Sequence, residues 1–350
     1  MSFAGVALIV IFISTLSILL LIPVAEQVGL VDVPNNSRKL HQGKPPLIGG
    51  LSTYIGLVIG LSLFMQPNHT SLTYFICSSI IVVLGVMDDA KDLSPKLRLV
   101  VQSMVAIIMC AGSGLYIENL GNLLGFGDIH LGVFGYGMTV IAALAAINAF
   151  NMIDGVDGLL GMSSLISFLG LSILFFLHGD QEGMYLALLI ALALVPYLLV
   201  NLQCPPLKVK KIFMGDTGSM LIGFTVVWLL IHGSQGERDL TSFSAATALW
   251  LIAFPLMDMA RVILTRYRNG KGIFDADRSH LHHILLRRST PRSVLLKITS
   301  LVAFFAVIGI TLNVTQRSDF TVFVLFLIAF VVYVKTVNKL AERDNNEQVG

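Results

Sequence analysis

Acidic residues occur in four short motifs at the ends of apolar segments. The motifs are GVMDDAKD with Asp88 and Asp89, NAFNMIDGVDGLLG with Asp154 and Asp157, KKIFMGDTGSM with Asp216, and FPLMDMAR with Asp258. Adjacent carboxylates repel each other, which raises at least one pKa unless a cation lies nearby. Oxygen ligands favour Mg²⁺ or Mn²⁺, and Mg²⁺ commonly binds one or two carboxylates together with substrate phosphates. The acids therefore predict a divalent cation and a phosphate-bearing substrate.

The motif GDTGS is typical of a helix start. Gly215 and Gly218 permit a tight turn, and Thr217 or Ser219 could cap the helix. A helix N-terminus has free N–H groups and partial positive charge, so it can bind a phosphate or a metal-bound phosphate. We expect Asp216 to be a direct metal ligand. The competing interpretation is a simple helix N-cap.

In NAFNMIDGVDGLLG the polar residues recur at every third position, as Asn148, Asn151, Asp154 and Asp157. On an ideal helix each step of three residues turns the side chain by about 60° relative to the last. Four such residues in a row would drift around half the surface, so the regular helix is expected to end near Gly155. We expect Asn148 to be a packing amide and the other three to face a cytosolic cleft.

Three histidines, His280, His282 and His283, lie in the motif DRSHLHHILLRR. Their spacing resembles a metal site, but the neighbouring arginines and the lack of cysteine or of a distant third histidine argue against zinc. Neutral or charged imidazoles can equally hydrogen-bond phosphate. We expect these histidines to contact a phosphate or a sugar.

Basic residues crowd the segments that carry the acids. They include Lys44, Lys96, Lys208, Lys210, Lys211, Arg266 and Arg268. A phosphate substrate accounts for such a group, but membrane topology and anionic lipid headgroups account for it as well. Lys44 lies in RKLHQGKPPLIGG, whose prolines and glycines predict a rigid turn before a helix.

The elements that carry these motifs are predicted to be membrane-spanning helices. The 350 residues are 55% hydrophobic and 13% charged, whereas a soluble domain has about 25% charged residues. Runs of roughly 20 apolar residues predict spans, and we count eleven, at 3–23, 47–66, 71–87, 98–116, 131–149, 160–177, 184–201, 218–232, 242–262, 294–314 and 320–338. The first is too long for a signal peptide and is interpreted as a retained helix. Cys77, Cys110 and Cys204 form neither a disulfide framework nor a zinc pattern. The fold class is therefore an all-α polytopic membrane protein, with residues 1–350 as one domain.

The basic residues orient the spans. All but Arg238 and Arg317 of the 23 lysines and arginines fall in alternate connections or at the C-terminus. The positive-inside rule puts these connections in the cytoplasm, at about 24–46, 88–97, 150–159, 202–217 and 263–293, with the N-terminus outside and the C-terminus inside.

All four acidic motifs then lie at the cytoplasmic ends of spans, and no Asp or Glu lies at the middle of one. A secondary transporter or proton pump usually has its ionisable groups near the bilayer midplane. Acids collected at one interface favour an enzyme that joins a cytosolic polar substrate to a membrane-bound one. The alternative is that these acids have no chemical role and only offset the charge of nearby basic residues at the interface.

The chain resembles the polyprenyl-phosphate N-acetylhexosamine-1-phosphate transferase family. The resemblance covers nearly the whole chain, through RKLHQGKPPLIGG, DDAKDLSPKLRL, NAFNMIDGVDGL, FMGDTGS, PLMDMAR and DRSHLHH in the family's order. Within the family, His-Leu-His-His and an eleventh span resemble the bacterial N-acetylglucosamine branch. The peptidoglycan branch typically has three consecutive histidines and ten spans. Ala90 departs from the pattern, because the closest relatives are expected to have arginine there.

This resemblance implies transfer of N-acetylglucosamine-1-phosphate from UDP-N-acetylglucosamine to undecaprenyl phosphate, with release of UMP, at the bacterial inner membrane. It implies that Asp216 ligates Mg²⁺, with Mn²⁺ as an alternative. It also implies that Asp88 and Asp89 are catalytic residues beside the metal, one of which deprotonates or orients the lipid phosphate. It further implies a nucleotide site of Lys44, Asn151, Asp154, Asp157 and Phe213, and a diphosphate or sugar site of Arg266 or Arg268, His280, His282 and His283. Membrane lipid is an expected partner, nucleic acid is not, and spans four and eleven could form a homodimer interface.

Several alternatives stay open. The same reaction could use another UDP-N-acetylhexosamine or UDP-MurNAc-pentapeptide, and the pathway that uses the product could be one of O antigen, common antigen or teichoic acid linkage. A nucleotide-sugar transporter is the alternative that is not an enzyme. A CDP-alcohol phosphotransferase is disfavoured because Asp154-Gly155 continues as Val156-Asp157 rather than Ala-Arg.

Overall fold

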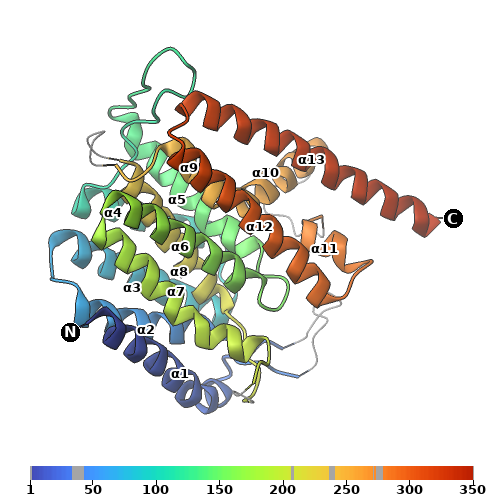
Figure 1. Ribbon diagram of the computed structural model, residues 1–350. Helices are drawn as coiled ribbons and strands as arrows, with labels where there is room; N and C mark the ends of the chain where they lie inside the picture. Colours follow the sequence, from blue (N-terminus) through green and yellow to red (C-terminus); the bar gives the residue numbers. More distant parts are fainter. Residues whose placement is uncertain are drawn as a thin grey trace.

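The computed structural model is a bundle of helices joined mostly by short connections (Figure 1). It describes residues 2–33, 43–205, 209–235, 241–270, 272 and 279–349, with side chains up to residue 343. The helices are α1 (Phe3–Val28), α2 (Gly49–Phe64), α3 (His69–Lys91), α4 (Pro95–Ser113), α5 (Phe134–Met152), α6 (Leu159–His178), α7 (Gln181–Asn201), α8 (Gly215–Ser234), α9 (Ala245–Leu251), α10 (Ala253–Arg268), α11 (Leu281–Leu286), α12 (Pro291–Val314) and α13 (Asp319–Val349). The described residues contain isolated bridges but no strand.

Each predicted span coincides with a helix or a pair of helices. Within the described residues, nine helices are long and apolar enough to cross a membrane, and the bent pair α9–α10 makes ten if it counts as one span. The remaining predicted span is α2, which has only 16 residues. An all-helical polytopic membrane protein fits these helices, while the count of eleven and the orientation stay predictions. Arg38, Lys39, Lys208, Arg238, Lys271 and Arg278, which contributed to the orientation, lie outside the described residues.

The ninth predicted span is broken rather than continuous, since α9 and α10 meet at Ile252 with a bend of 85°. Pro255 has no N–H for the carbonyl of Leu251, and its ring disfavours helical backbone just before it. The Ser167 hydroxyl of α6 donates to that Leu251 carbonyl at 2.8 Å. A neighbouring helix thus satisfies the group that the proline leaves open, as a bend within a membrane requires.

Helix α8 lies at the centre and packs against α2, α3, α5, α6, α7 and α9. Its first turn fits tightly against two neighbours. A Cβ on Gly50 of α2 would overlap the Gly218 backbone, and a Cβ on Gly85 of α3 would overlap the Thr217 backbone. Because both neighbours lack side chains here, the N-terminus of α8 contacts the backbones that lead to Lys44 and to Asp88.

The segment before α8 is held by backbone hydrogen bonds to the start of α2. Phe213 N–H donates to the Pro46 carbonyl, and Gly49 N–H donates to the Phe213 carbonyl, both at 2.9 Å. The turn after α1 and the GDTGS motif are therefore one local unit.

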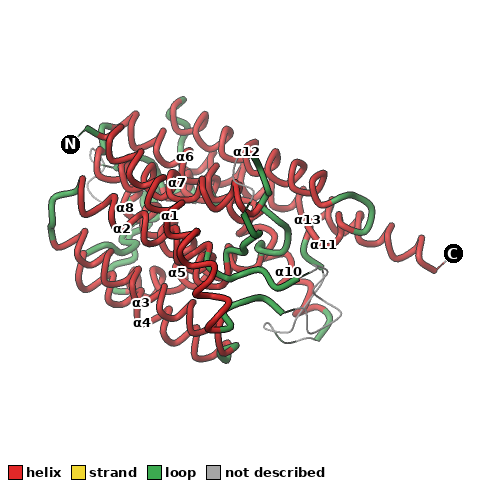
Figure 2. The backbone as a smooth tube through the Cα atoms, turned by 90° about the horizontal axis from the view of Figure 1, so that it is seen from below, coloured by secondary structure: helices red, strands yellow, loops and turns green. Residues whose placement is uncertain are grey.

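Helices α10, α11 and α13 lie together, on the opposite side of the molecule from α3 and α4 (Figure 2). Helix α13 packs against α9, α10 and α11. The histidine motif is therefore held by the C-terminal helix as well as by α10.

Candidate functional site

Asp216 lies in the first turn of α8 and receives a hydrogen bond from α5. The Asn151 amide nitrogen donates to Asp216 Oδ1 at 2.5 Å and to the Ser219 hydroxyl at 2.8 Å. Both amide protons of Asn151 are thereby engaged. Sequence reasoning placed Asn151 against the nucleotide, and the structure places it where it orients Asp216.

Asp89 caps α8 from a different helix. Its carboxylate accepts from the N–H groups of Asp216 at 2.7 Å and Thr217 at 3.1 Å, and from the Thr217 hydroxyl at 2.7 Å. The expected cap by Thr217 or Ser219 is wrong, because α8 has no side-chain cap of its own. Asp89 therefore occupies two of the N–H groups at the start of α8 that a phosphate could have used.

Asp88 does not take part in that cap and is 3% exposed. It forms an ion pair with Arg98 of α4 at 2.7 Å and accepts from the Leu93 N–H at 2.8 Å. Asp88 also lies close enough to Asp216 for their charges to interact. The adjacent carboxylates therefore face different partners, and only Asp88 has a cation beside it.

The loop between α5 and α6 carries Asp154 and Asp157. The side chain of Asp154 is exposed to solvent, although many protein atoms lie around it. The desolvation that these atoms cause, together with the negative charges of Asp216, Asp89 and Asp157, raises the pKa of Asp154 to about 7. Asp157 pairs with Lys211 at 2.5 Å. The Lys211 ammonium in turn lies 5.4 Å from the centre of the Phe213 ring. Asp157 and Phe213, two predicted nucleotide contacts, are therefore linked through Lys211, which the sequence analysis named only as one of the basic residues.

The remaining basic candidates differ in exposure. Lys44 is exposed, Arg266 is only 4% exposed, and Arg268 is exposed at the end of α10. The side chain of Arg266 therefore turns inward and that of Arg268 outward.

The three histidine rings lie against one another beside the loop that carries Asp154, and those of His280 and His282 are stacked. The ring of His282 lies 5.6 Å from that of His280 and 4.2 Å from that of His283. A Cβ on Gly155 would overlap the His282 ring, so the histidine motif and the α5–α6 loop are in contact. Burial, followed by the charges of His283 and His280, lowers the pKa of His282 to about 3. His282 is therefore neutral, and its Nδ1 has no hydrogen-bond partner in the described part of the chain.

The acidic end fits a divalent cation with few protein ligands. Among the described residues no three His, Cys, Asp or Glu side chains converge as a metal cage. Asp154 and Asp216 each lack an ion-pair partner there, in contrast to Asp88 and Asp157. Carboxylates without an ion-pair partner suit Mg²⁺, which keeps several waters and binds substrate phosphates.

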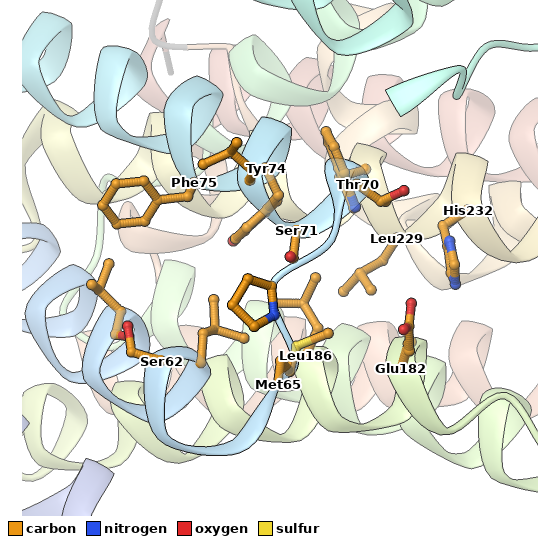
Figure 3. Close-up of a pocket in the computed structure, with 16 residues that line it drawn as sticks. Ser62, Met65, Thr70, Ser71, Tyr74, Phe75, Glu182, Leu186, Leu229 and His232 are labelled. Carbon is orange, nitrogen blue, oxygen red and sulfur yellow. The ribbon is translucent and has the colours of Figure 1, made fainter. Parts of the chain in front are cut away.

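A cavity of ≈ 270 Å³ lies elsewhere, between the other ends of α2, α3, α7 and α8 (Figure 3). Its lining includes Tyr74, Phe75, Leu186 and Leu229, with Glu182 and His232 at one side. None of the predicted site residues lines it. The candidate site is therefore defined by its charged side chains and not by this cavity.

Sequence reasoning did not predict the contacts of several residues of this site. Arg98, Ser219 and Lys211 had no assigned partner, and neither did Asp258, which hydrogen-bonds both His280 and Tyr333. No local spacing could have found the pair Asp258–Tyr333, whose members are 75 residues apart. Asn148 is confirmed as a packing amide, which donates to Gln102 at 3.1 Å and to the Leu144 carbonyl at 2.8 Å.

The fold and the site define a class: a polytopic membrane protein with carboxylates around the start of α8 and a histidine motif against the α5–α6 loop. A family model described as glycosyl transferase family 4 matches residues 71–234. The undecaprenyl-phosphate alpha-N-acetylglucosaminyl 1-phosphate transferase of Salmonella typhi is 43% identical over 91% of this chain and 87% of the relative. The protein of that name from Haemophilus influenzae is 41% identical over 92% and 90%, and that from Escherichia coli strain K12 is 41% identical over 89% and 84%. The chain belongs to this transferase family and is an enzyme of the phosphoglycosyl transferase kind.

Proposed function

We propose that this chain transfers N-acetylglucosamine-1-phosphate from UDP-N-acetylglucosamine to undecaprenyl phosphate and releases UMP. The observation that carries the proposal is Asp216, which is oriented by Asn151, lies beside Asp88 and has no ion-pair partner in the described residues. The names of relatives more than 40% identical over most of the chain support the substrates.

In this proposal Asp216 holds Mg²⁺, or Mn²⁺ in its place. The cation, when bound, neutralises diphosphate charge and stabilises the departing UMP. Asn151 keeps the Asp216 carboxylate in one orientation, and Asp89 fixes the helix turn that carries it. The role of these residues is positioning, which is most of what phosphoryl transfer requires of a protein.

The reaction needs no strong base. A phosphate oxygen of the lipid attacks the phosphorus attached to the sugar, and the bond from that phosphorus to the bridging oxygen breaks. The attacking oxygen is already anionic, so no proton has to be removed. We therefore assign Asp88, which is held by Arg98 and Leu93, and Asp89 to orientation rather than to proton abstraction.

The nucleotide is assigned to the side of the site formed by Lys44, Asp154, Asp157 and Phe213. The contact between Lys211 and both Asp157 and Phe213 supports a common site for a charged and a planar group. The diphosphate and sugar are assigned to Arg266 and the histidines. Arg266 is preferred to Arg268 because its side chain is buried, whereas that of Arg268 is exposed.

We further propose that the active site faces the cytoplasm at the inner membrane, with the N-terminus outside and the C-terminus inside. The segregation of basic residues supports this orientation. The product would enter a lipid-linked surface polysaccharide pathway, such as that of O antigen. A homodimer through α4 and α13 remains part of the proposal.

The test uses purified protein in detergent with Mg²⁺, undecaprenyl phosphate and a panel of UDP-sugars, and follows UMP release. UMP release that needs the lipid phosphate, and that is fastest with UDP-N-acetylglucosamine, is expected. Release with none of the sugars would overturn the enzyme, and a different preferred sugar would correct the substrate. Uptake of UDP-sugar into sealed vesicles without UMP would instead support the transporter.

A further inference from the structure

Asp258 in α10 is a fully buried carboxylate to which the proposed chemistry gives no role, and its exposure is 0%. Its Oδ2 accepts from His280 Nδ1 at 2.7 Å. Its Oδ1 accepts from the Leu281 N–H at 3.1 Å and from the Tyr333 hydroxyl at 2.8 Å. One carboxylate thus receives hydrogen bonds from the start of α11 and from the last helix, α13.

Arg261 holds the same segment from the other side. Its guanidinium lies 3.7 Å from Asp258 Oδ1 and donates to the Ser279 carbonyl. It also reaches the side-chain oxygen of Asn338 in α13 at 3.5 Å. The backbone at 279–281 is therefore fixed by two charged residues of α10, each of which also contacts α13.

We propose that Asp258 is a positioning residue for the UDP-sugar, which acts through His280 and couples the histidine motif to α13 through Tyr333. The inference rests on the proposed function only for the identity of the ligand. It adds a residue that determines how the histidines are presented, and it gives the C-terminal helix a part in the active site.

The geometry determines what Asp258 does to His280. An ionised carboxylate can only accept, so the proton lies on Nδ1, and Nε2 is the ring nitrogen that Asp258 does not engage. The Leu281 N–H is one of the first N–H groups of α11, which has no side-chain cap of its own. Asp258 therefore sets both the ring of His280 and the direction of the helix that carries His282 and His283.

A purely structural role is the alternative, and the chain offers matched controls for it. Asp180 also caps a helix and pairs with a histidine, since it accepts from the Gly183 N–H at 2.9 Å and lies 3.0 Å from His232 Nε2. Tyr74 also buries a hydroxyl, which hydrogen-bonds Thr225 at 2.8 Å. Both lie at the ends of the helices opposite to the acids, so Asp180→Asn and Tyr74→Phe match Asp258→Asn and Tyr333→Phe.

The experiment measures steady-state UMP release with each substrate varied in turn. Asp258→Asn and Tyr333→Phe are expected to lower kcat/KM for UDP-N-acetylglucosamine by about ten-fold or more, as loss of a supporting hydrogen bond does. The KM for undecaprenyl phosphate should stay within about two-fold, as should all constants of both controls. Unchanged UDP-sugar constants in Asp258→Asn, or equal losses for both substrates, would overturn the proposal.

A double-mutant cycle with His280→Ala tests whether Asp258 acts through His280. In the His280→Ala background, Asp258→Asn should cause a smaller further loss than in the wild type, and what is left reflects the hydrogen bond to the Leu281 N–H. Losses that multiply would overturn the proposal. If Asp258→Asn fails to fold, Tyr333→Phe and His280→Ala form the cycle, with the same two outcomes.

A second readout does not depend on activity. Hydrogen exchange of the amides at 279–286 should accelerate in Asp258→Asn and not in Asp180→Asn, because the Leu281 N–H loses its charged acceptor. Unchanged exchange would overturn the proposed positioning of the histidine motif by Asp258, even if the enzyme is active. If the wild-type protein releases no UMP with any sugar, the proposed function fails. The exchange measurement still tests whether Asp258 positions the histidine motif.

Discussion

Two helix starts in this molecule are capped by a carboxylate from a neighbouring helix. Asp89 of α3 caps α8, and Asp258 of α10 caps α11. In each case the capped helix has no side-chain cap of its own and carries residues of the candidate site. A cap supplied from another element fixes the helix start relative to that element, which a local cap does not do.

The two caps differ in the charge around them. Asp258 is surrounded by Arg261, by the Nδ1–H of His280 and by a tyrosine hydroxyl. Asp89 receives only neutral donors, and its charge interacts with those of Asp216 and Asp154. The negative charge of Asp258 is thus balanced, which suits phosphate or sugar oxygens near the histidines. The negative charge around Asp89 is not balanced, which suits a cation there.

Removing the charge of Asp216 should have the largest effect. Asp216→Asn is expected to lower UMP release by about 100-fold or more, because the proposed cation loses its direct ligand. Folding should persist, since the remaining oxygen can still accept from Asn151. Detergent-solubilised protein is assayed across a range of Mg²⁺ concentrations, beside its thermal unfolding. Near-normal turnover in a folded variant would remove Asp216 from the metal site.

Asp89→Asn separates the two caps. It retains one acceptor oxygen but faces three donors with an amide and removes negative charge from a helix N-terminus. We expect a loss of stability of about 1 kcal/mol and a loss of activity of about 10–100-fold. Thermal unfolding and UMP release are measured beside Asp258→Asn. If Asp89→Asn raised the KM for the UDP-sugar alone, as Asp258→Asn should, the two caps would serve the same end of the substrate.

Asn151 and Asn148 allow a comparison within one helix. Asn151→Ala removes both donors to α8 and should lower kcat by about ten-fold or more, because Asp216 loses its orientation. Asn148→Ala removes an amide that contacts Gln102 and should cost stability but little activity. Steady-state rates of both, normalised to folded protein, check this. Equal rates would mean that Asn151 only packs.

The helices and the collection of acids at one end were predictable because they depend on local hydrophobic runs and on charge placement. The α5 helix was expected to end near Gly155 and ends at Met152, and Asn148 packs as expected. The bend at Ile252 was missed, although Pro255 was a visible signal for it.

The two caps that come from a different helix, Asp89 on α8 and Asp258 on α11, were not predictable from the sequence. Asp89 lies 127 residues from Asp216, and Asp258 lies 75 residues from Tyr333. Local propensity favoured Thr217 or Ser219 as the cap of α8. Tertiary packing at Gly85 brought a stronger, charged acceptor to the same N–H groups.

Gly155 lies where the α5–α6 loop, which carries Asp154 and Asp157, contacts the histidine motif. Gly155→Ala should lower activity by roughly a few-fold, because its Cβ would displace the His282 ring. Gly137→Ala in α5 is the control, since a Cβ there meets nothing and alanine favours the helix. UMP release and unfolding temperature are compared for the pair. A Gly155→Ala variant as active as Gly137→Ala would show that the histidines do not depend on this contact.

The smallest effect is expected at Asp180, a cap that lies on its own helix and away from both regions. Burial alone would raise the pKa of Asp180, but the hydrogen bonds from His232 and the Gly183 N–H lower it below its ordinary value. A carboxyl whose pKa is lowered by folding contributes stability above its unfolded pKa of about 4, and that contribution is lost as the pH falls through the folded pKa. Asp180→Asn should therefore destabilise the protein by about 1 kcal/mol at neutral pH, and the difference should vanish in acid. Activity should be unchanged. Unfolding of the wild type and the variant is followed from neutral to acidic pH. A difference in stability that persisted in acid would mean that the amide disturbs packing. A loss of activity would mean that a cap from the same helix, far from the site, can also affect the site.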